Sequence, residues 1–241
     1  MPASPLIEQV RGLSPTISVG ILTADMMSLG SEVRLREQAG VKLLHFDVMD
    51  GEFCPMMTFG PPFIKGIRTS LIKDVHLMIR DPLEKLEAFS AAGADMITAH
   101  LEGCMHPHRL LQALGQMTHA NEPGRGILRG IAVNPGTPVE AVEPLLGELD
   151  MVTLLAVNPG WGGQKFIKTT PARMEKLLGL IRGSKRDILM GVDGGITRDN
   201  IDEAVRMGAD IIVTGSAVFD GKDAAGNARR MLANVAAAHR G

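Results

Sequence analysis

The sequence predicts an α/β protein that forms a single (β/α)₈ barrel, a TIM barrel. Two observations support this prediction. Short apolar runs alternate with amphipathic stretches eight times along the chain, as expected when parallel strands are buried on both faces and covered by helices. The length of 241 residues is also close to the roughly 250 residues of a typical barrel of this type.

The expected strands are apolar runs that each end at polar or glycine-rich residues: 17–22, 42–47, 72–78, 96–100, 128–133, 151–157, 188–193 and 211–214. Helical stretches lie between them, and three of these are expected at 32–39, 83–92 and 201–207. Each of the three is followed by a glycine, which favours the left-handed C-cap of a helix. The recurrence of helix, glycine and apolar strand is typical of repeated βα units.

We expect one barrel domain at 17–241, because no linker-like shift in composition divides the chain. Residues 1–16 are interpreted as a leader segment or a first short helix before the barrel. This segment mixes proline and serine with short apolar pieces, and it lacks the long apolar region of a secretory signal.

Composition and charge limit which partners the protein is expected to bind and in which cellular compartment it is expected. Hydrophobic residues make up 45% of the chain and charged residues 22%, which is ordinary for a soluble globular protein. The formal charge of −2 gives no general attraction to nucleic acid or to an anionic membrane, and no apolar run is long enough to span a bilayer. Two distant cysteines, Cys54 and Cys104, make no disulfide framework, so we expect a cytoplasmic protein. Because barrels of this kind usually associate, we also expect a homo-oligomer.

Ionisable side chains end several of the expected strands, and in a closed barrel these ends gather on the face where active sites are built. His45 and Asp47 lie two residues apart, so an extended strand points both to one face. His76 and Asp193 end two other strands. Because burying such groups is costly without partners, a shared metal explains them better than chance. Two imidazoles and two carboxylates suit Zn²⁺, Fe²⁺, Mn²⁺ or Co²⁺ better than Ca²⁺. Other polar residues at strand ends are His100 with Glu102, Asn134, Asn158 and Ser216.

Glycine-rich segments follow the sixth, seventh and eighth expected strands. Their backbone N–H groups could hold a phosphate, and barrels frequently bind phosphate in these last loops. A single motif of this kind is weak evidence, since glycines also make tight turns. The residues expected to bind phosphate are Gly160, Trp161, Gly162, Gly163, Gly194, Gly195, Gly215 and Ser216.

Taken in order, these motifs resemble those of ribulose-phosphate 3-epimerase and related ketose-phosphate 3-epimerases. The matching segments are ILTAD at 21–25, HFDVMDG at 45–51, HLM at 76–78, NPGWGGQKF at 158–166, VDGGI at 192–196 and GSAVF at 215–219. The resemblance covers nearly everything after Thr16 and implies a barrel of the ribulose-phosphate-binding type. It further implies one divalent metal ion per subunit, held by His45, Asp47, His76 and Asp193, and a phosphorylated ketose substrate that His76 and the glycine loops would contact.

The implied reaction is inversion of C3 of the ketose phosphate through a 2,3-enediolate, with Asp47 and Asp193 as the acid–base pair on opposite faces of the substrate. A proton beside a ketone is too weakly acidic to leave at neutral pH unless the enediolate is stabilised. A metal can supply this stabilisation as a Lewis acid. The substrate would be D-ribulose 5-phosphate with D-xylulose 5-phosphate, or a related tetrulose or hexulose phosphate.

The sequence departs from the family pattern near the expected sugar end of the site. Gly20 stands where the family usually has a substrate-contacting serine, Glu52 and Met56 replace a His and an Asn, and Leu-Ala at 155–156 replaces a common Met-Ser pair. The loss of polar partners alters substrate discrimination more than it alters fold. The preferred ketose phosphate is therefore left open.

Two other classes of function are alternatives to an epimerase. The first is a lyase or decarboxylase on the same barrel, which would also form an enediolate and which an Asp-x-Lys-x-x-Asp signature would favour. The segment that follows Asp47 supplies no such lysine. The second is a non-catalytic barrel that binds phosphate only, and the intact Asp47 and Asp193 argue against it.

Overall fold

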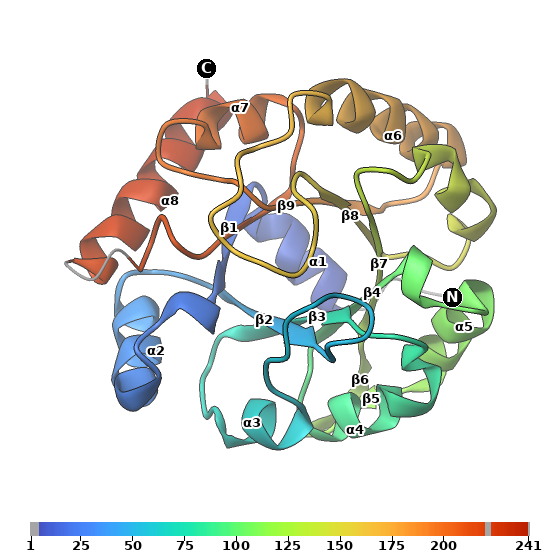
Figure 1. Cartoon of the computed structure of the whole chain (residues 1–241), viewed down its shortest axis with the longest axis horizontal. Helices are drawn as coiled ribbons and strands as arrows, with labels where there is room; N and C mark the ends of the chain where they lie inside the picture. The colour runs from blue at the N-terminus through green and yellow to red at the C-terminus, as the bar shows by residue number, and fades with distance from the viewer. Residues whose placement is uncertain (1–4, 220–222, 241) are drawn as a thin grey trace.

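Eight parallel strands close into a barrel in the computed structural model, which describes residues 5–219 and 223–240 (Figure 1). The order of the strands around the barrel is β1-β10-β9-β8-β7-β4-β3-β2. Their bounds are Thr16–Gly20 (β1), Leu43–Met49 (β2), Ile72–Met78 (β3), Met96–His100 (β4), Leu128–Val133 (β7), Met151–Leu155 (β8), Leu189–Asp193 (β9) and Ile211–Thr214 (β10). This architecture confirms the fold class that the sequence predicts.

Helices surround the barrel and connect its strands (Figure 1). The α-helices are Leu29–Gln38 (α2), Pro61–Gly66 (α3), Leu86–Ala91 (α4), Pro107–Gln116 (α5), Thr170–Ser184 (α6), Ile201–Arg206 (α7) and Ala224–Arg240 (α8). Short 3₁₀ helices cover Ile21–Thr23 (η1), Met26–Ser28 (η2), Pro82–Lys85 (η3), Leu101–Gly103 (η4) and Val139–Leu145 (η5). Within the described part of the chain, no helix combines the length and the apolar character needed to cross a membrane.

An antiparallel hairpin of β5 (Thr118–His119) and β6 (Glu122–Gly126) interrupts the connection between α5 and β7. The sequence analysis did not predict it, because these segments lack the alternation of apolar and polar residues that marks a half-buried strand. The hairpin packs on α4 and on the first helix of the chain, so it lies away from the carboxyl ends of the barrel strands.

The first helix, α1 (Pro5–Leu13), closes one end of the barrel. Leu6, Ile7 and Val10 are buried in one cluster with the first residues of seven strands: Leu43, Ile72, Met96, Leu128, Met151, Leu189 and Ile211. The segment interpreted as a leader is therefore, over α1, a helix whose apolar side chains fill the amino-terminal end of the barrel. Access to the barrel interior is left at the carboxyl ends of the strands.

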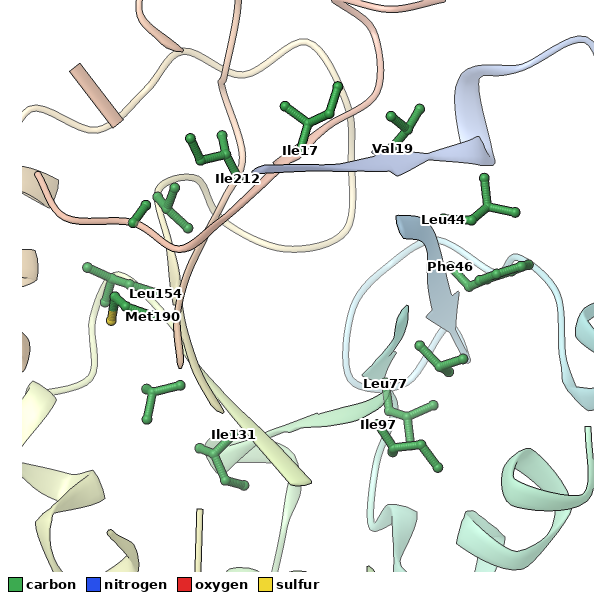
Figure 2. Packing of buried hydrophobic residues seen from close by; sticks show 14 of the residues in the cluster. Ile17, Val19, Leu44, Phe46, Leu77, Ile97, Ile131, Leu154, Met190 and Ile212 are labelled. Atoms are coloured by element: carbon green, nitrogen blue, oxygen red, sulfur yellow. The ribbon is translucent and has the colours of Figure 1, made fainter. Parts of the chain in front are cut away.

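Alternation along the strands separates an apolar outer layer from an interior that holds the polar residues of the barrel. Outward side chains pack toward the helices, as Figure 2 shows for Ile17, Val19, Leu44, Phe46, Leu77, Ile97, Ile131, Leu154, Met190 and Ile212. The intervening positions are apolar where the strands begin, against α1, and several are polar or small further along, where Ser18 on β1 and His45 on β2 both contact Asp74 on β3. Because successive side chains of a strand point to opposite faces, the same pattern builds the core and the site.

Two strand glycines leave room for threonines in this interior. Gly130 on β7 pairs with Thr98 on β4, and Gly191 on β9 pairs with Thr153 on β8. A Cβ added at Gly130 would lie 2.2 Å from Thr98 Oγ1 and 2.9 Å from its Cβ. The barrel therefore has no space for a side chain at position 130.

We expect Gly130→Ala to lower the free energy of unfolding by about 1–3 kcal/mol, because overpacking a core forces its neighbours to move. Gly126→Ala is the matched control, since Gly126 also lies in a strand but has nothing within 4 Å of the added Cβ. Denaturant unfolding of both variants measures the difference. Equal stability of the two variants would show that the contact with Thr98 is relieved at no cost.

Candidate active site

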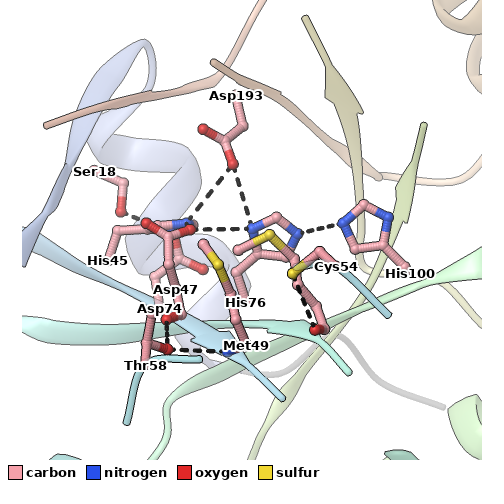
Figure 3. A network of polar contacts seen from close by, with 11 residues as sticks. Ser18, His45, Asp47, Met49, Cys54, Thr58, Asp74, His76, His100 and Asp193 are labelled. Carbon is pink, nitrogen blue, oxygen red and sulfur yellow. Dashed lines mark hydrogen bonds and ion pairs between the residues drawn. The ribbon is translucent and has the colours of Figure 1, made fainter. Parts of the chain in front are cut away.

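Four side chains from three strands meet at the carboxyl ends of the barrel strands. His45 and Asp47 lie on β2, His76 on β3 and Asp193 at the end of β9. One potential ligand atom of each lies within 4.8 Å of those of the other three. Figure 3 shows the two imidazoles beside each other, with both carboxylates directed toward them. The structure thus brings together the four residues that the sequence selected as metal ligands.

The unpartnered atoms of this group fit a divalent metal. His45 Nε2 lies 3.3 Å from Asp47 Oδ1, and His76 Nδ1 lies 3.3 Å from Asp193 Oδ2. Both nitrogens are buried, and neither has a hydrogen-bond partner in the structure. A buried nitrogen without a partner costs free energy, whereas two such nitrogens facing two carboxylate oxygens form the donor set of a transition-metal site.

Asp74 holds the ring of His45 from behind. Its Oδ2 lies 2.7 Å from His45 Nδ1 and accepts a hydrogen bond of 2.8 Å from Ser18 Oγ. A proton on Nδ1 therefore bonds to the carboxylate, and Nε2 faces the carboxylates of Asp47 and Asp193. Such a carboxylate behind a histidine ligand fixes the ring and its tautomer. The sequence analysis missed Asp74, although Asp74-x-His76 mirrors the spacing of His45-x-Asp47.

The charges in the group stabilise one another. Burial would lower the pKa of His45, but the carboxylates of Asp74 and Asp47 outweigh it and hold this pKa well above the ordinary 6.5. Burial likewise opposes protonation of His76, whose pKa is nevertheless raised by the carboxylates of Asp193 and Asp47 that face its Nδ1. Burial would raise the pKa of Asp47, but the two imidazoles hold it below its usual range. Asp47 is therefore ionised at neutral pH.

A cavity of about 390 Å³ opens above these carboxylates. Its volume falls in the range of about 300–1,000 Å³ that small-molecule sites occupy. Asp47 and Asp193 line it, and so does every glycine-loop residue expected to bind phosphate: Gly160, Trp161, Gly162, Gly163, Gly194, Gly195, Gly215 and Ser216. His76 is not among the described lining residues, because it lies buried beneath the carboxylates.

The glycine loops have shapes that side chains would disrupt. Gly195 has φ of +67°, and a Cβ there would lie 2.6 Å from the backbone N of Phe166. Gly160 has φ of +113°, and a Cβ there would lie 2.7 Å from Pro55 Cδ. Gln164 braces the first loop, because its Nε2 donates to the carbonyl oxygens of Asn158 and Trp161. The loops are therefore held close to the cavity, with their backbone uncovered.

The departures from the family pattern separate into two groups. Gly20, Met56 and Leu155 line the cavity, so these changes alter its wall. Glu52 is exposed, and its Oε1 lies 2.7 Å from Nη1 of Arg80. Glu52 is not among the lining residues, so its replacement of a histidine acts on the loop outside the cavity.

A larger cavity of about 630 Å³ lies at the opposite end of the barrel, between the hairpin, α1 and the start of β3. Its described lining includes neither Asp47 nor Asp193. Volume alone would favour this cavity. Active sites of such barrels nevertheless form at the carboxyl ends of the strands, so the smaller cavity is the candidate active site.

The fold and the site together define a (β/α)₈-barrel enzyme with a histidine and carboxylate centre beneath glycine-rich loops. A family model described as the ribulose-phosphate 3 epimerase family matches residues 16–219. The chain belongs to this family, whose members are isomerases.

Curated relatives support this assignment over most of the chain. A ribulose-phosphate 3-epimerase of Rhodobacter capsulatus is 41% identical, over 85% of this chain and 86% of that protein. The enzyme of the same name from Bacillus subtilis is 38% identical, over 86% of this chain and 93% of its own. Among solved structures, 3-hexulose-6-phosphate synthase from Salmonella typhimurium aligns with a TM-score of 0.65 at 20% identity, covering 93% of this chain and 100% of that one. At that identity the likeness concerns the fold alone.

Proposed function

We propose that this protein is a metal-dependent ketose-phosphate 3-epimerase that inverts C3 of its substrate through a 2,3-enediolate. Two acidic side chains, Asp47 and Asp193, line one cavity and face the same pair of imidazoles, and this observation carries the proposal. Membership of the epimerase family supports the reaction class.

In the proposed reaction the two carboxylates act as proton carriers on opposite faces of the substrate. Asp47 is ionised in the protein and can accept a proton from C3. Asp193, on β9, would then return a proton to the other face, so that the configuration inverts. In the reverse direction the two roles exchange, as microscopic reversibility requires. A positioned acid or base contributes about 10²–10⁴-fold to the rate of such a transfer.

His45, Asp47, His76 and Asp193 would hold one divalent ion, either Zn²⁺ or one of Fe²⁺, Mn²⁺ and Co²⁺. When bound, the ion would stabilise the negative charge that develops on the C2 and C3 oxygens. Backbone N–H groups of the glycine loops at 160–163, 194–195 and 215–216 would bind the substrate phosphate at the other side of the cavity.

The proposed substrates are D-ribulose 5-phosphate with D-xylulose 5-phosphate, or a related tetrulose or hexulose phosphate. Gly20 bears on the choice, because a Cβ added there would meet Asp47 Oδ2 and Gly215 Cα at 3.8 Å, which are ordinary van der Waals distances. The cavity wall therefore has room for a small side chain beside a proposed proton carrier. Met56 and Leu155 make other parts of this wall apolar, which favours a substrate that needs few hydrogen bonds there.

A panel of ketose phosphates in deuterated water tests the proposed function. We expect the metal-loaded protein to introduce deuterium at C3 of at least one panel member, because the returned proton comes from a carboxylate that exchanges with solvent. NMR of the sugar gives both the position of the deuterium and the epimer formed. Unphosphorylated D-ribulose is the control for the phosphate loops.

Two outcomes of the panel would contradict the proposal. An absence of exchange with every member would favour a barrel that only binds phosphate. Cleavage of a carbon–carbon bond, or loss of carbon dioxide, would favour the lyase or decarboxylase instead.

The compartment and the assembly state stay predictions from the sequence. We propose a cytoplasmic homo-oligomer, and no nucleic acid or membrane partner. Sedimentation of the full chain at several concentrations measures the number of subunits.

A further inference from the structure

The ring of His76 contacts a third histidine on its far side. His76 Nε2 lies 2.9 Å from His100 Nε2, the last residue of β4 (Figure 3). The ring centroids are 4.9 Å apart at an interplanar angle of 21°. These values describe two rings that meet end to end through their Nε2 atoms. Both rings are at most 1% exposed, so no bulk water can take the place of this bond.

One proton must lie between the two facing nitrogens, and the geometry decides which ring carries it. His76 Nδ1 faces Asp47 and Asp193, so a neutral His76 binds a metal only if its proton is on Nε2. His76 Nε2–H then donates to His100 Nε2. His100 must in turn carry its proton on Nδ1, which lies 3.3 Å from Glu102 Oε2. The ionised carboxylate of Glu102 can only accept a hydrogen bond there. The contacts of His76, His100 and Glu102 are therefore compatible with one arrangement of the protons.

Glu102 is fixed at the other end of this chain of contacts. Its Oε1 accepts a 2.8 Å hydrogen bond from the backbone N of Asn134. Burial would raise its pKa, but hydrogen bonds from His100, Thr137 and Asn134 lower it, so Glu102 stays ionised. Arg173 on α6 donates to the carbonyl oxygens of Asn134 and Thr137 and holds that segment in place.

The ring of His100 is also held sterically. Phe53, from the loop that follows β2, packs against it with ring centroids 4.7 Å apart. Asp50 fixes this loop, because its carboxylate accepts hydrogen bonds from the backbone N atoms of Glu52, Phe53 and Arg80. His100 therefore has one orientation available, with Nε2 toward His76.

We infer that His100 and Glu102 are positioning residues of the metal site. They hold His76 in the tautomer that presents the Nδ1 lone pair, as Asp74 does for His45 through a single contact. The inference rests on the metal site of the proposed function, and it goes beyond that function because neither residue is one of the four candidate ligands or lines the cavity. Loss of the partner behind a histidine ligand costs about 10–100-fold in metal affinity.

The test compares Zn²⁺ affinity of His100→Leu and His100→Gln in the full chain, measured by competition with a chromophoric chelator. We expect His100→Leu to lose about 10–100-fold in affinity, because His76 Nε2–H has no acceptor. We expect His100→Gln to keep most of the affinity, since the amide oxygen can reach the same position. His119→Gln is the control, because His119 is a buried imidazole near the opposite end of the barrel.

Glu102→Gln distinguishes an effect on the tautomer of His76 from an effect on packing. The amide of this variant has the shape of Glu102, but it must use its oxygen for Asn134 N–H and turns its NH₂ toward His100 Nδ1. The hydrogen bonds from residue 102 through His100 to His76 then run in the opposite direction, which places the His76 proton on Nδ1. We therefore expect weaker Zn²⁺ binding with unchanged thermal stability. It also provides the test if His100→Leu does not fold.

¹⁵N NMR of the imidazoles in the metal-free wild-type protein gives a readout without metal or activity. We expect the His100 proton on Nδ1 and none on Nε2. A proton on Nε2, or wild-type Zn²⁺ affinity in both His100→Leu and Glu102→Gln, would overturn the inference. A panel without any epimerisation, together with the expected tautomer and Zn²⁺ affinities, would refute the proposed function and leave the inference standing.

Discussion

Asp193→Asn is expected to leave a folded protein that epimerises its substrate about 10²–10⁴-fold more slowly, because one of the two proposed proton carriers is lost. Asparagine has the same shape, but its amide does not exchange a proton with C3 and is a weak ligand in place of a carboxylate. The side chain of Asp193 lines the cavity and is 14% exposed, and asparagine fills the same volume. The fold should therefore survive.

The measurement follows interconversion of the two epimers by NMR, beside a thermal unfolding curve. Asp199→Asn is the matched control, because it removes the same charge from an exposed position six residues further along the chain. Turnover of Asp193→Asn close to that of the control would show that the second proton carrier is a different group. A loss of turnover together with a loss of the fold would call for Asp47→Asn as the second variant.

The strands of the barrel follow from the sequence, because each is a short, mostly apolar run that ends at polar or glycine-rich residues. β3, β4, β7 and β10 have the bounds expected from the sequence. The ends of β1 and β8 were placed two residues too far, at 22 and 157. After β1 the apolar residues Ile21 and Leu22 form a 3₁₀ turn. An apolar turn and an apolar strand have the same hydropathy. A hydropathy pattern therefore extends the strand into an apolar turn that follows it.

The four residues of the candidate metal site were predicted to converge, because strand ends of a closed barrel meet on one face. Asp74 was not predicted, because it lies near the start of β3 and not at a strand end. His100 and Glu102 were noted at a strand end, but the contact of His100 with His76 depends on the orientation of the two rings. The packing of α1 into the barrel end depends on tertiary contacts with seven strands. Such relations are properties of the folded chain and have no local signature.

Removal of the divalent metal is expected to abolish turnover, and its rebinding is expected to release protons. In the metal-free protein the pKa values of His45 and His76 are raised above 6.5, which favours protonated rings whose protons the metal must displace. Apparent metal affinity should therefore fall as the pH falls, by up to about tenfold per pH unit for each proton released. Above the raised pKa values the affinity should become independent of pH.

The direction of this effect distinguishes a metal site from a cluster that serves only stability. The raised pKa values stabilise the metal-free fold when the imidazoles are protonated, and this stabilisation is lost as pH rises through them. Bound metal reverses the trend, because it needs the deprotonated rings and binds only the folded state. Thermal unfolding with and without Zn²⁺, between about pH 6 and pH 8, measures both trends. If added metal leaves the unfolding temperature unchanged at the higher pH, and the chelated protein retains its turnover, then His45, Asp47, His76 and Asp193 hold no catalytic ion.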